Sequence, residues 1–291
     1  MHVAIHSGVV FSDGGLLLKS LQANARVLQE NGIVLFGPRR FRKAFKTPLN
    51  ALDEGKLTPD AFERLRAQIP DDPETGRVVM STADFIGELN SAIKDGQFYP
   101  HAGRRLALLD QAFEGHEVEL FIGLQNPGSF IPKVLMALPD ETRESILAST
   151  DLSCLSWLTL IEDIHDLAPA VSITVWANEE CPLICGDIIR SLCGLSSDIP
   201  LTEEFSLLSS LVDADGKREI EEIQQQVGHT DPALLHDRLA AVFSQHALPD
   251  RIEEELDFPG WSAEIHEAFS ELYTQDLERL KKMPGVRFLG R

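Results

Sequence analysis

VAIHSGVVFSDGGLLLKSL, residues 3–21, is the stretch that decides the fold expected for this chain. An apolar run at 3–9 predicts a buried strand, which leads through a glycine-containing turn into a helical pattern. The backbone N–H groups of such a turn and the dipole of the following helix commonly bind a phosphate. Here Asp13 places a carboxylate in the turn, which satisfies the dipole itself and repels phosphate, and the turn has no lysine or arginine. The stretch therefore predicts a fold more clearly than it predicts a bound ligand.

Predicted strands and helices alternate along the next 180 residues. Strands are expected at 33–36, 78–81, 117–124 and 171–176, and helices at 16–31, 58–69, 101–114 and 155–167. This alternation predicts an α/β protein, a three-layer α/β/α P-loop-like fold with a mainly parallel sheet covered by helices on both faces.

From about residue 200 the pattern becomes mainly helical, with long amphipathic stretches at 231–246 and 261–283. The apolar residues 286–289 allow one last short strand. We expect an α/β core over 1–200 and a mainly helical C-terminal part over 201–291 packed on it, together forming one compact domain.

Composition excludes several classes of protein. The 291 residues include 46 Asp and Glu against 26 Lys and Arg, a formal net charge of -20, which disfavours binding to nucleic acid or to an anionic membrane. No apolar run approaches 18 residues and no leader pattern opens the chain, so a cytoplasmic protein is expected. We expect the cysteines to be reduced core residues rather than metal ligands; they are Cys154, Cys181, Cys185 and Cys193.

The first 31 residues resemble the sulfotransferase-like family of the P-loop nucleoside triphosphate hydrolase superfamily. That family typically opens with IHxGxHKTGTT and a helix of the form LQxxLxxN, and this chain reads IHSGVVFSDGG at 5–15 and LLKSLQAN at 17–24. Later stretches resemble family landmarks in the same order. VVMSTADF (78–85) resembles the family's strand that ends in Ser-Ser-Glu, and LFIGLQNP (120–127) resembles the family's strand that ends in Arg-x-Pro. VWANEE (175–180), LYTQD (272–276) and MPGV (283–286) resemble further landmarks.

The resemblance implies a site for phosphoadenosine phosphosulfate or its product adenosine 3′,5′-bisphosphate. In the family, loop Lys and Thr groups hold the 5′-phosphosulfate, an Arg holds the 3′-phosphate, and a Glu or His is the base. The corresponding positions here are Phe11 for the Lys, Asp13 for a glycine, Gly14 and Gly15 for the two Thr, Gln125 for the Arg and Ala83 for the Glu. Only Ser12 keeps a hydroxyl where the family has one.

These replacements predict that ordinary sulfuryl transfer is lost. Each charge-assisted hydrogen bond contributes about 1.5–3 kcal/mol, so loss of the Lys and the Arg alone weakens donor binding about a hundred- to ten-thousandfold. The leading hypothesis is therefore a sulfotransferase-like protein that acts as a binding or regulatory module. It would bind a small anionic ligand or a protein partner.

An alternative is an active sulfotransferase with a rearranged donor site. The Gly14 and Gly15 amides would then hold the phosphosulfate, with Arg39, Arg40 or Lys133 supplying the missing cations. A further alternative is a scaffold whose helical C-terminal part binds another protein.

The segment RRFRKAFK (39–46) carries five cations in eight residues. It is either an anion site, a docking strip for an acidic partner, or a solvated face anchored by Phe41 and Phe45. Two other sites have simpler interpretations. Arg104 and Arg105, at the start of a predicted helix, are expected to form a surface ion pair. His6 is expected to be a buried, hydrogen-bonded core histidine.

Overall fold

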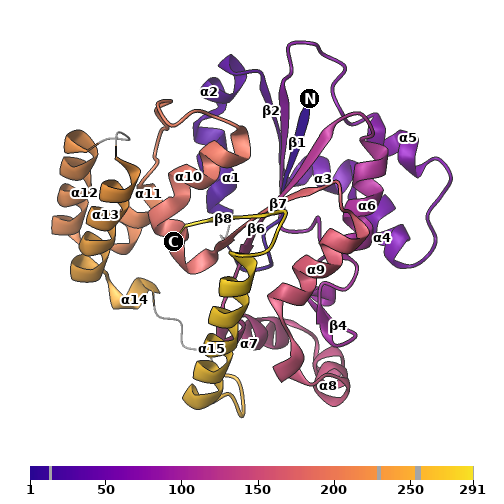
Figure 1. The fold of residues 1–291 in the computed structure, drawn as a ribbon. Helices are drawn as coiled ribbons and strands as arrows, with labels where there is room; N and C mark the ends of the chain where they lie inside the picture. The colour runs from indigo at the N-terminus through magenta and orange to yellow at the C-terminus, as the bar shows by residue number, and fades with distance from the viewer. Residues whose placement is uncertain (13–14, 228–230, 253–256, 291) are drawn as a thin grey trace.

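The computed structural model describes residues 1–12, 15–227, 231–252 and 257–290. Within these residues the centre is a parallel sheet in the strand order β2-β3-β1-β6-β7-β8 (Figure 1). Its strands are β1 (His2–His6), β2 (Ile33–Phe36), β3 (Arg77–Ser81), β6 (Glu117–Leu124), β7 (Ser172–Ala177) and β8 (Val286–Leu289). A small antiparallel hairpin consists of β4 (Ile93–Lys94) and β5 (Gln97–Phe98).

Strand β1 lies in the middle of the sheet, between β3 and β6. Val3, Ala4 and Ile5 have no exposed surface. A short, continuous apolar run of this kind is typical of a parallel strand that helices cover on both faces.

One face of the sheet is covered by α1 (Leu16–Ala23), α2 (Ala25–Glu30) and α10 (Cys181–Cys193). Their buried side chains, among them Leu17, Leu21 and Ile188, form one apolar cluster with Val79 and Phe121 of the strands. Burial of this apolar stripe stabilises the helices more than their intrinsic propensity does.

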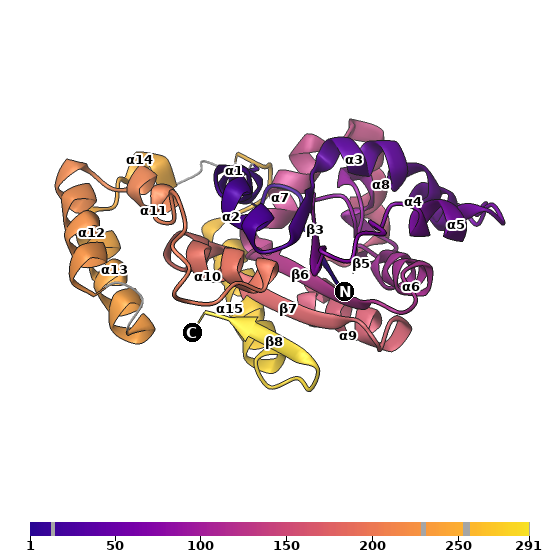
Figure 2. The ribbon, with the colours of Figure 1, turned by 90° about the horizontal axis from the view of Figure 1, so that it is seen from above.

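The opposite face is covered by a larger set of helices, whose buried side chains belong to a second apolar cluster. These are α3 (Pro38–Ala44), α4 (Lys46–Asp53), α5 (Ala61–Arg66), α6 (Ala102–Ala112), α7 (Pro127–Ala137), α8 (Asp140–Ser149), α9 (Trp157–Leu167) and α15 (Ala263–Leu280). Figure 2 shows α1, α2 and α10 on one side of the strands and α6 and α9 on the other. The expected three-layer α/β/α fold with a mainly parallel sheet is confirmed.

The C-terminal part of the chain lies in two environments. α11 (Ser206–Leu211), α12 (Ala214–Gln226) and α13 (Pro232–His246) form a small core of their own, followed by α14 (Pro249–Ile252). α13 stands beside α10 and α12 packs on α13, away from the sheet (Figures 1 and 2). In contrast, α15 packs on α7 and α9, and β8 pairs with β7. The last helix and strand therefore belong to the layers of the central sheet.

The helix expected at 16–31 is broken at Asn24. The side-chain amide of Asn24 donates to the Ser20 carbonyl at 2.8 Å and to the Thr202 carbonyl at 3.1 Å, and its oxygen accepts from the Thr202 N–H at 2.7 Å. Asn24 is buried, so these bonds to a distant segment outweigh continuation of the helix. The helix expected at 58–69 is also shorter, since α5 begins only at Ala61.

The cysteine prediction is confirmed for three residues and wrong for one. Cys181, Cys185 and Cys193 are buried on α10, and burial raises the pKa of the Cys193 thiol to about 12. Cys154 is free but exposed, because it lies in a 3-10 turn (Leu152–Cys154) outside the helix that follows.

Candidate functional site

The candidate site lies at the carboxyl ends of β1, β3 and β6. The loop that follows β1 meets the turn after β3 and the residues after β6 at this edge. In open α/β sheets, ligands bind at the carboxyl edge, where connections leave a central strand in opposite directions. β1 is such a strand, because the chain passes from it to β2 on one side and later reaches β6 on the other.

Two buried side chains, those of Tyr99 and Gln125, hold the loop after β1 by hydrogen bonds. The Val10 N–H donates to the Tyr99 hydroxyl at 3.0 Å, and the Gln125 side-chain amide donates to the Val10 carbonyl at 3.0 Å. Gln125 is only 4% exposed, and its own carbonyl accepts from the Trp157 indole N–H at 2.6 Å. Both backbone groups of Val10 are therefore bonded to the protein itself.

The backbone of Ser12, in the same loop, is also hydrogen-bonded within the protein. The Ser12 N–H donates to the Val9 carbonyl at 3.2 Å, and the Asn178 side-chain amide donates to the Ser12 carbonyl at 2.7 Å. The Ser12 hydroxyl lies against Gly8, in the space that a side chain at position 8 would need. The Ser12 backbone thus has protein partners at both its N–H and its carbonyl.

Phe11 does not fill the loop. It has a left-handed backbone (φ 67°), which is strained for a bulky residue, and its side chain is 46% exposed. Gly15 is also left-handed (φ 82°) and precedes α1, with open space where a side chain would be. The predicted ligand Gly14, like Asp13, lies outside the described residues.

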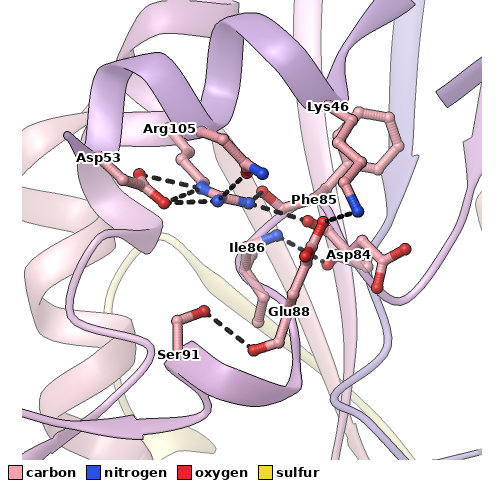
Figure 3. A network of polar contacts seen from close by, with 10 residues as sticks. Lys46, Asp53, Asp84, Phe85, Ile86, Glu88, Ser91 and Arg105 are labelled. Atoms are coloured by element: carbon pink, nitrogen blue, oxygen red, sulfur yellow. Dashed lines mark hydrogen bonds and ion pairs between the residues drawn. The ribbon is translucent and has the colours of Figure 1, made fainter. Parts of the chain in front are cut away.

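The turn after β3 is held by Arg105, which is 2% exposed (Figure 3). Its Nε donates to the Asp53 carboxylate at 3.1 Å, its Nη2 to Asn50 Oδ1 at 3.0 Å and its Nη1 to the Asp84 carbonyl at 3.0 Å. The expectation of a surface ion pair is therefore wrong. Arg105 forms its ion pair in the interior, where α4, α6 and this turn meet.

Asp84 brings a carboxyl group to this edge of the sheet. It is the residue after Ala83, the position at which the family resemblance implies a Glu. Burial, and next the negative charge of Glu88, raise the pKa of Asp84. Glu88 itself pairs with Lys46, with 2.7 Å between Oε1 and Nζ (Figure 3). Sequence reasoning missed Asp84, although it stands in the quoted stretch 78–85.

Two further bonds connect these parts. The Ser7 hydroxyl accepts from the Ile86 N–H at 3.1 Å, which joins the loop after β1 to the turn after β3. His6 is 4% exposed, and its Nδ1 lies 2.9 Å from Ser81 Oγ, so the prediction of a hydrogen-bonded core histidine is confirmed. Its ring stacks on that of Trp176, with 6.0 Å between centroids.

The predicted cations lie on two different helices. Arg39 and Arg40 are on α3, at the carboxyl end of the edge strand β2, and line a cavity of about 1030 Å³. The lining of that cavity includes no residue of the loop at 7–12. Lys133 is half-buried on α7 and is not part of the lining either. The structure therefore groups Arg39 with Arg40 but assigns neither of them to the loop after β1.

Comparisons with protein-family models, curated proteins and solved structures found no match to this chain. Among the described residues, no cluster of three or more His, Cys, Asp or Glu side chains is arranged to hold a metal ion. No described helix combines the length and the apolar character needed to cross a bilayer.

Proposed function

We propose that this protein is a sulfotransferase-like binding module that no longer transfers sulfate from phosphoadenosine phosphosulfate. The observation that carries the proposal is the closure of the loop after β1 by Gln125 and Tyr99. A phosphate-binding loop must direct free backbone N–H groups at its anion. Here the N–H groups of Val10 and Ser12 are bonded to protein oxygens instead.

The charges around the site support the same conclusion. Glu179 accepts a hydrogen bond from the Asn126 N–H at 2.8 Å, where α7 begins, and Asp84 brings a second carboxyl group close to Tyr99. A donor nucleotide with several negative charges would meet these carboxylates without the Lys and the Arg of the family pattern. Its binding would be weakened further by repulsion.

The test is a calorimetric titration of the protein with adenosine 3′,5′-bisphosphate, with AMP and sulfate as controls. No binding at millimolar ligand is expected, while circular dichroism shows the sample to be folded. Micromolar binding selective for the bisphosphate would contradict the proposal.

A pair of gain-of-charge variants makes this test sharper. Phe11→Lys/Gln125→Arg restores both cations and removes the amide that ties down Val10, so it should bind the bisphosphate more tightly than the unchanged protein. Leu234→Lys/Gln224→Arg adds the same charges at exposed positions on α13 and α12 and should not. Equal binding by the two variants would show that the loop does not control donor affinity.

Asp84 favours a second candidate function, an active transferase with a rearranged donor site. A half-buried carboxyl with a raised pKa, next to the expected Glu position, is suited to act as a general base. In this alternative the Gly14 and Gly15 amides would hold the phosphosulfate, and Arg39, Arg40 or Lys133 would supply the missing cations. Loss of bisphosphate binding in Arg39→Glu/Arg40→Glu/Lys133→Glu, together with loss of sulfate transfer in Asp84→Asn, is the expected result. Unchanged binding in the first variant would rule this alternative out.

A further inference from the structure

The cavity on α3 is a groove beside an unpaired strand edge. Residues Val34–Phe36 of β2 form part of its lining, with α3 and the end of α5. Within the described residues β2 pairs only with β3, from Ile33↔Arg77 to Phe36↔Met80, so its other edge has no neighbouring strand. Such an edge presents backbone N–H and C=O groups on which another chain can pair.

The groove is positively charged in a strongly acidic protein. Arg39, Arg40, Lys43 and Arg64 line it, and no Asp or Glu does so among the described residues. With a formal net charge of -20 for the whole chain, this concentration of cations is a local exception. Charge complementarity therefore favours an acidic occupant.

Of the four cations, Arg64 pairs with Asp60 at 3.7 Å, Arg40 is held in place, and Arg39 and Lys43 are available. The Arg40 guanidinium lies over the Phe36 ring, 3.8 Å from its centroid, and its Nη2 donates to the Gln68 carbonyl at 3.0 Å. In contrast, the exposed Arg39 and Lys43 form neither a hydrogen bond nor an ion pair with any part of the chain that the structure describes. A ligand can therefore use a positioned guanidinium and two exposed cations together.

We propose that this groove binds an extended acidic peptide segment of a partner protein. The segment adds to the outer edge of β2 as a further strand, and its alternate residues carry the carboxylates that meet Arg39, Arg40 and Lys43. Side chains of a strand point to opposite faces in turn, so every second residue can reach the cations on α3. β2 has four residues, about 13 Å of strand at roughly 3.3 Å per residue, so a segment of about four to six residues covers it.

A peptide explains more of the groove than a small anion does. An inorganic phosphate would use the cations but neither the strand edge nor the half-buried Val34 and Leu35 beside it. An extended peptide uses all three. This inference gives a partner class to the binding module proposed above, and it rests on that proposal.

The experiment measures fluorescence anisotropy of a labelled eight-residue peptide of alternating Glu and Thr, titrated with the full-length protein. Micromolar binding that weakens at higher salt is expected. Two matched peptides are compared with it: one has Gln in place of Glu, and one carries an N-methyl group on every backbone amide, which keeps the charges but removes the N–H donors of both strand edges. Each should bind at least tenfold more weakly.

The protein variants separate the groove from general electrostatics. Arg39→Glu/Lys43→Glu should weaken peptide binding at least tenfold. Arg104→Glu/Lys217→Glu makes the same charge change at exposed positions on α6 and α12 and should leave it within twofold. Circular dichroism of both variants checks that they are folded.

Three results would overturn the proposal: no binding of the Glu–Thr peptide, equal binding of the N-methylated peptide, or equal effects of the two variants. Binding of the N-methylated peptide together with displacement by inorganic pyrophosphate would identify a simple anion site instead. The titration with adenosine 3′,5′-bisphosphate is independent of the peptide. If adenosine 3′,5′-bisphosphate binds to the unchanged protein and equally to Arg39→Glu/Lys43→Glu, the proposed function is contradicted, because the loop after β1 then binds the nucleotide. The proposal that the groove binds a peptide is not affected by that result.

Discussion

The side-chain amide of Gln125 donates a hydrogen bond to the carbonyl oxygen of Val10, with 3.0 Å between Nε2 and O. The two residues are 115 positions apart in the chain, and the bond ties the end of β6 to the loop after β1. Gln125 is in turn fixed by the Trp157 indole, which donates to its backbone carbonyl. Gln125 thus holds the loop after β1 to the sheet.

Replacing Gln125 by Leu should destabilise the protein by about 1–3 kcal/mol, because the Val10 carbonyl loses its partner in a partly buried setting. Urea unfolding followed by circular dichroism measures the change. Gln224→Leu, on the exposed side of α12, is the matched control and should stay within about 0.5 kcal/mol of the unchanged protein. Equal effects of the two substitutions would show that the bond to Val10 contributes nothing.

Tyr99→Phe removes the hydroxyl that accepts from the Val10 N–H. Hydrogen exchange at the Val10 amide should become faster by about ten- to a hundredfold, since a lost bond of about 1.4–2.8 kcal/mol corresponds to that range. Tyr273→Phe is the control: it removes a buried hydroxyl that bonds to the Leu124 carbonyl at 2.8 Å. It should lower stability without selectively exposing the Val10 amide, and a similar pattern of exchange in both variants would contradict the prediction.

Arg105→Met should destabilise the fold by about 3–5 kcal/mol, because it leaves the half-buried carboxylate of Asp53 without its partner. The double variant Arg105→Met/Asp53→Leu should recover part of that loss, since no uncompensated charge remains. Arg104→Met changes the exposed neighbouring residue and should have little effect. Chemical denaturation of these three variants and of the single variant Asp53→Leu provides the measurement, and a double variant as unstable as the sum of its two single changes would argue against a coupled pair.

Asp84→Asn should make stability less dependent on pH. Burial, followed by the charge of Glu88, raises the pKa of Asp84 in the folded protein above its ordinary value of 3.8. The folded state therefore disfavours ionisation, and the unchanged protein loses stability relative to Asp84→Asn as pH rises through the raised pKa. Thermal melts should show the variant more stable at pH 7, with the difference shrinking as pH falls toward 3.8.

The control for this pH effect is Asp71→Asn in an exposed loop. Its melting temperature relative to the unchanged protein should be the same at pH 5 and pH 7. A constant difference for Asp84→Asn as well would mean that Asp84 ionises as freely in the fold as in the unfolded chain.

Much of the fold could be predicted because strand signals are local. The apolar runs at 33–36, 117–124 and 286–289 coincide with β2, β6 and β8, and the alternation with helices predicted the layers. The candidate site was predicted less completely. The sequence located the loop and its departures from the family pattern, yet the roles of Tyr99, Asp84 and Gln125 depend on contacts between distant segments.

The sequence by itself determined the alternation of strands and helices and the cation-rich segment 39–46, because hydrophobic period, turn residues and charge are properties of neighbouring residues. Tertiary structure alone decided that Arg105 is buried against Asp53, that the helix breaks at Asn24, and that the cations lie beside an unpaired edge of β2. The physical reason is that a buried polar group bonds to whichever partner the fold brings within reach, and that partner can lie more than a hundred residues away.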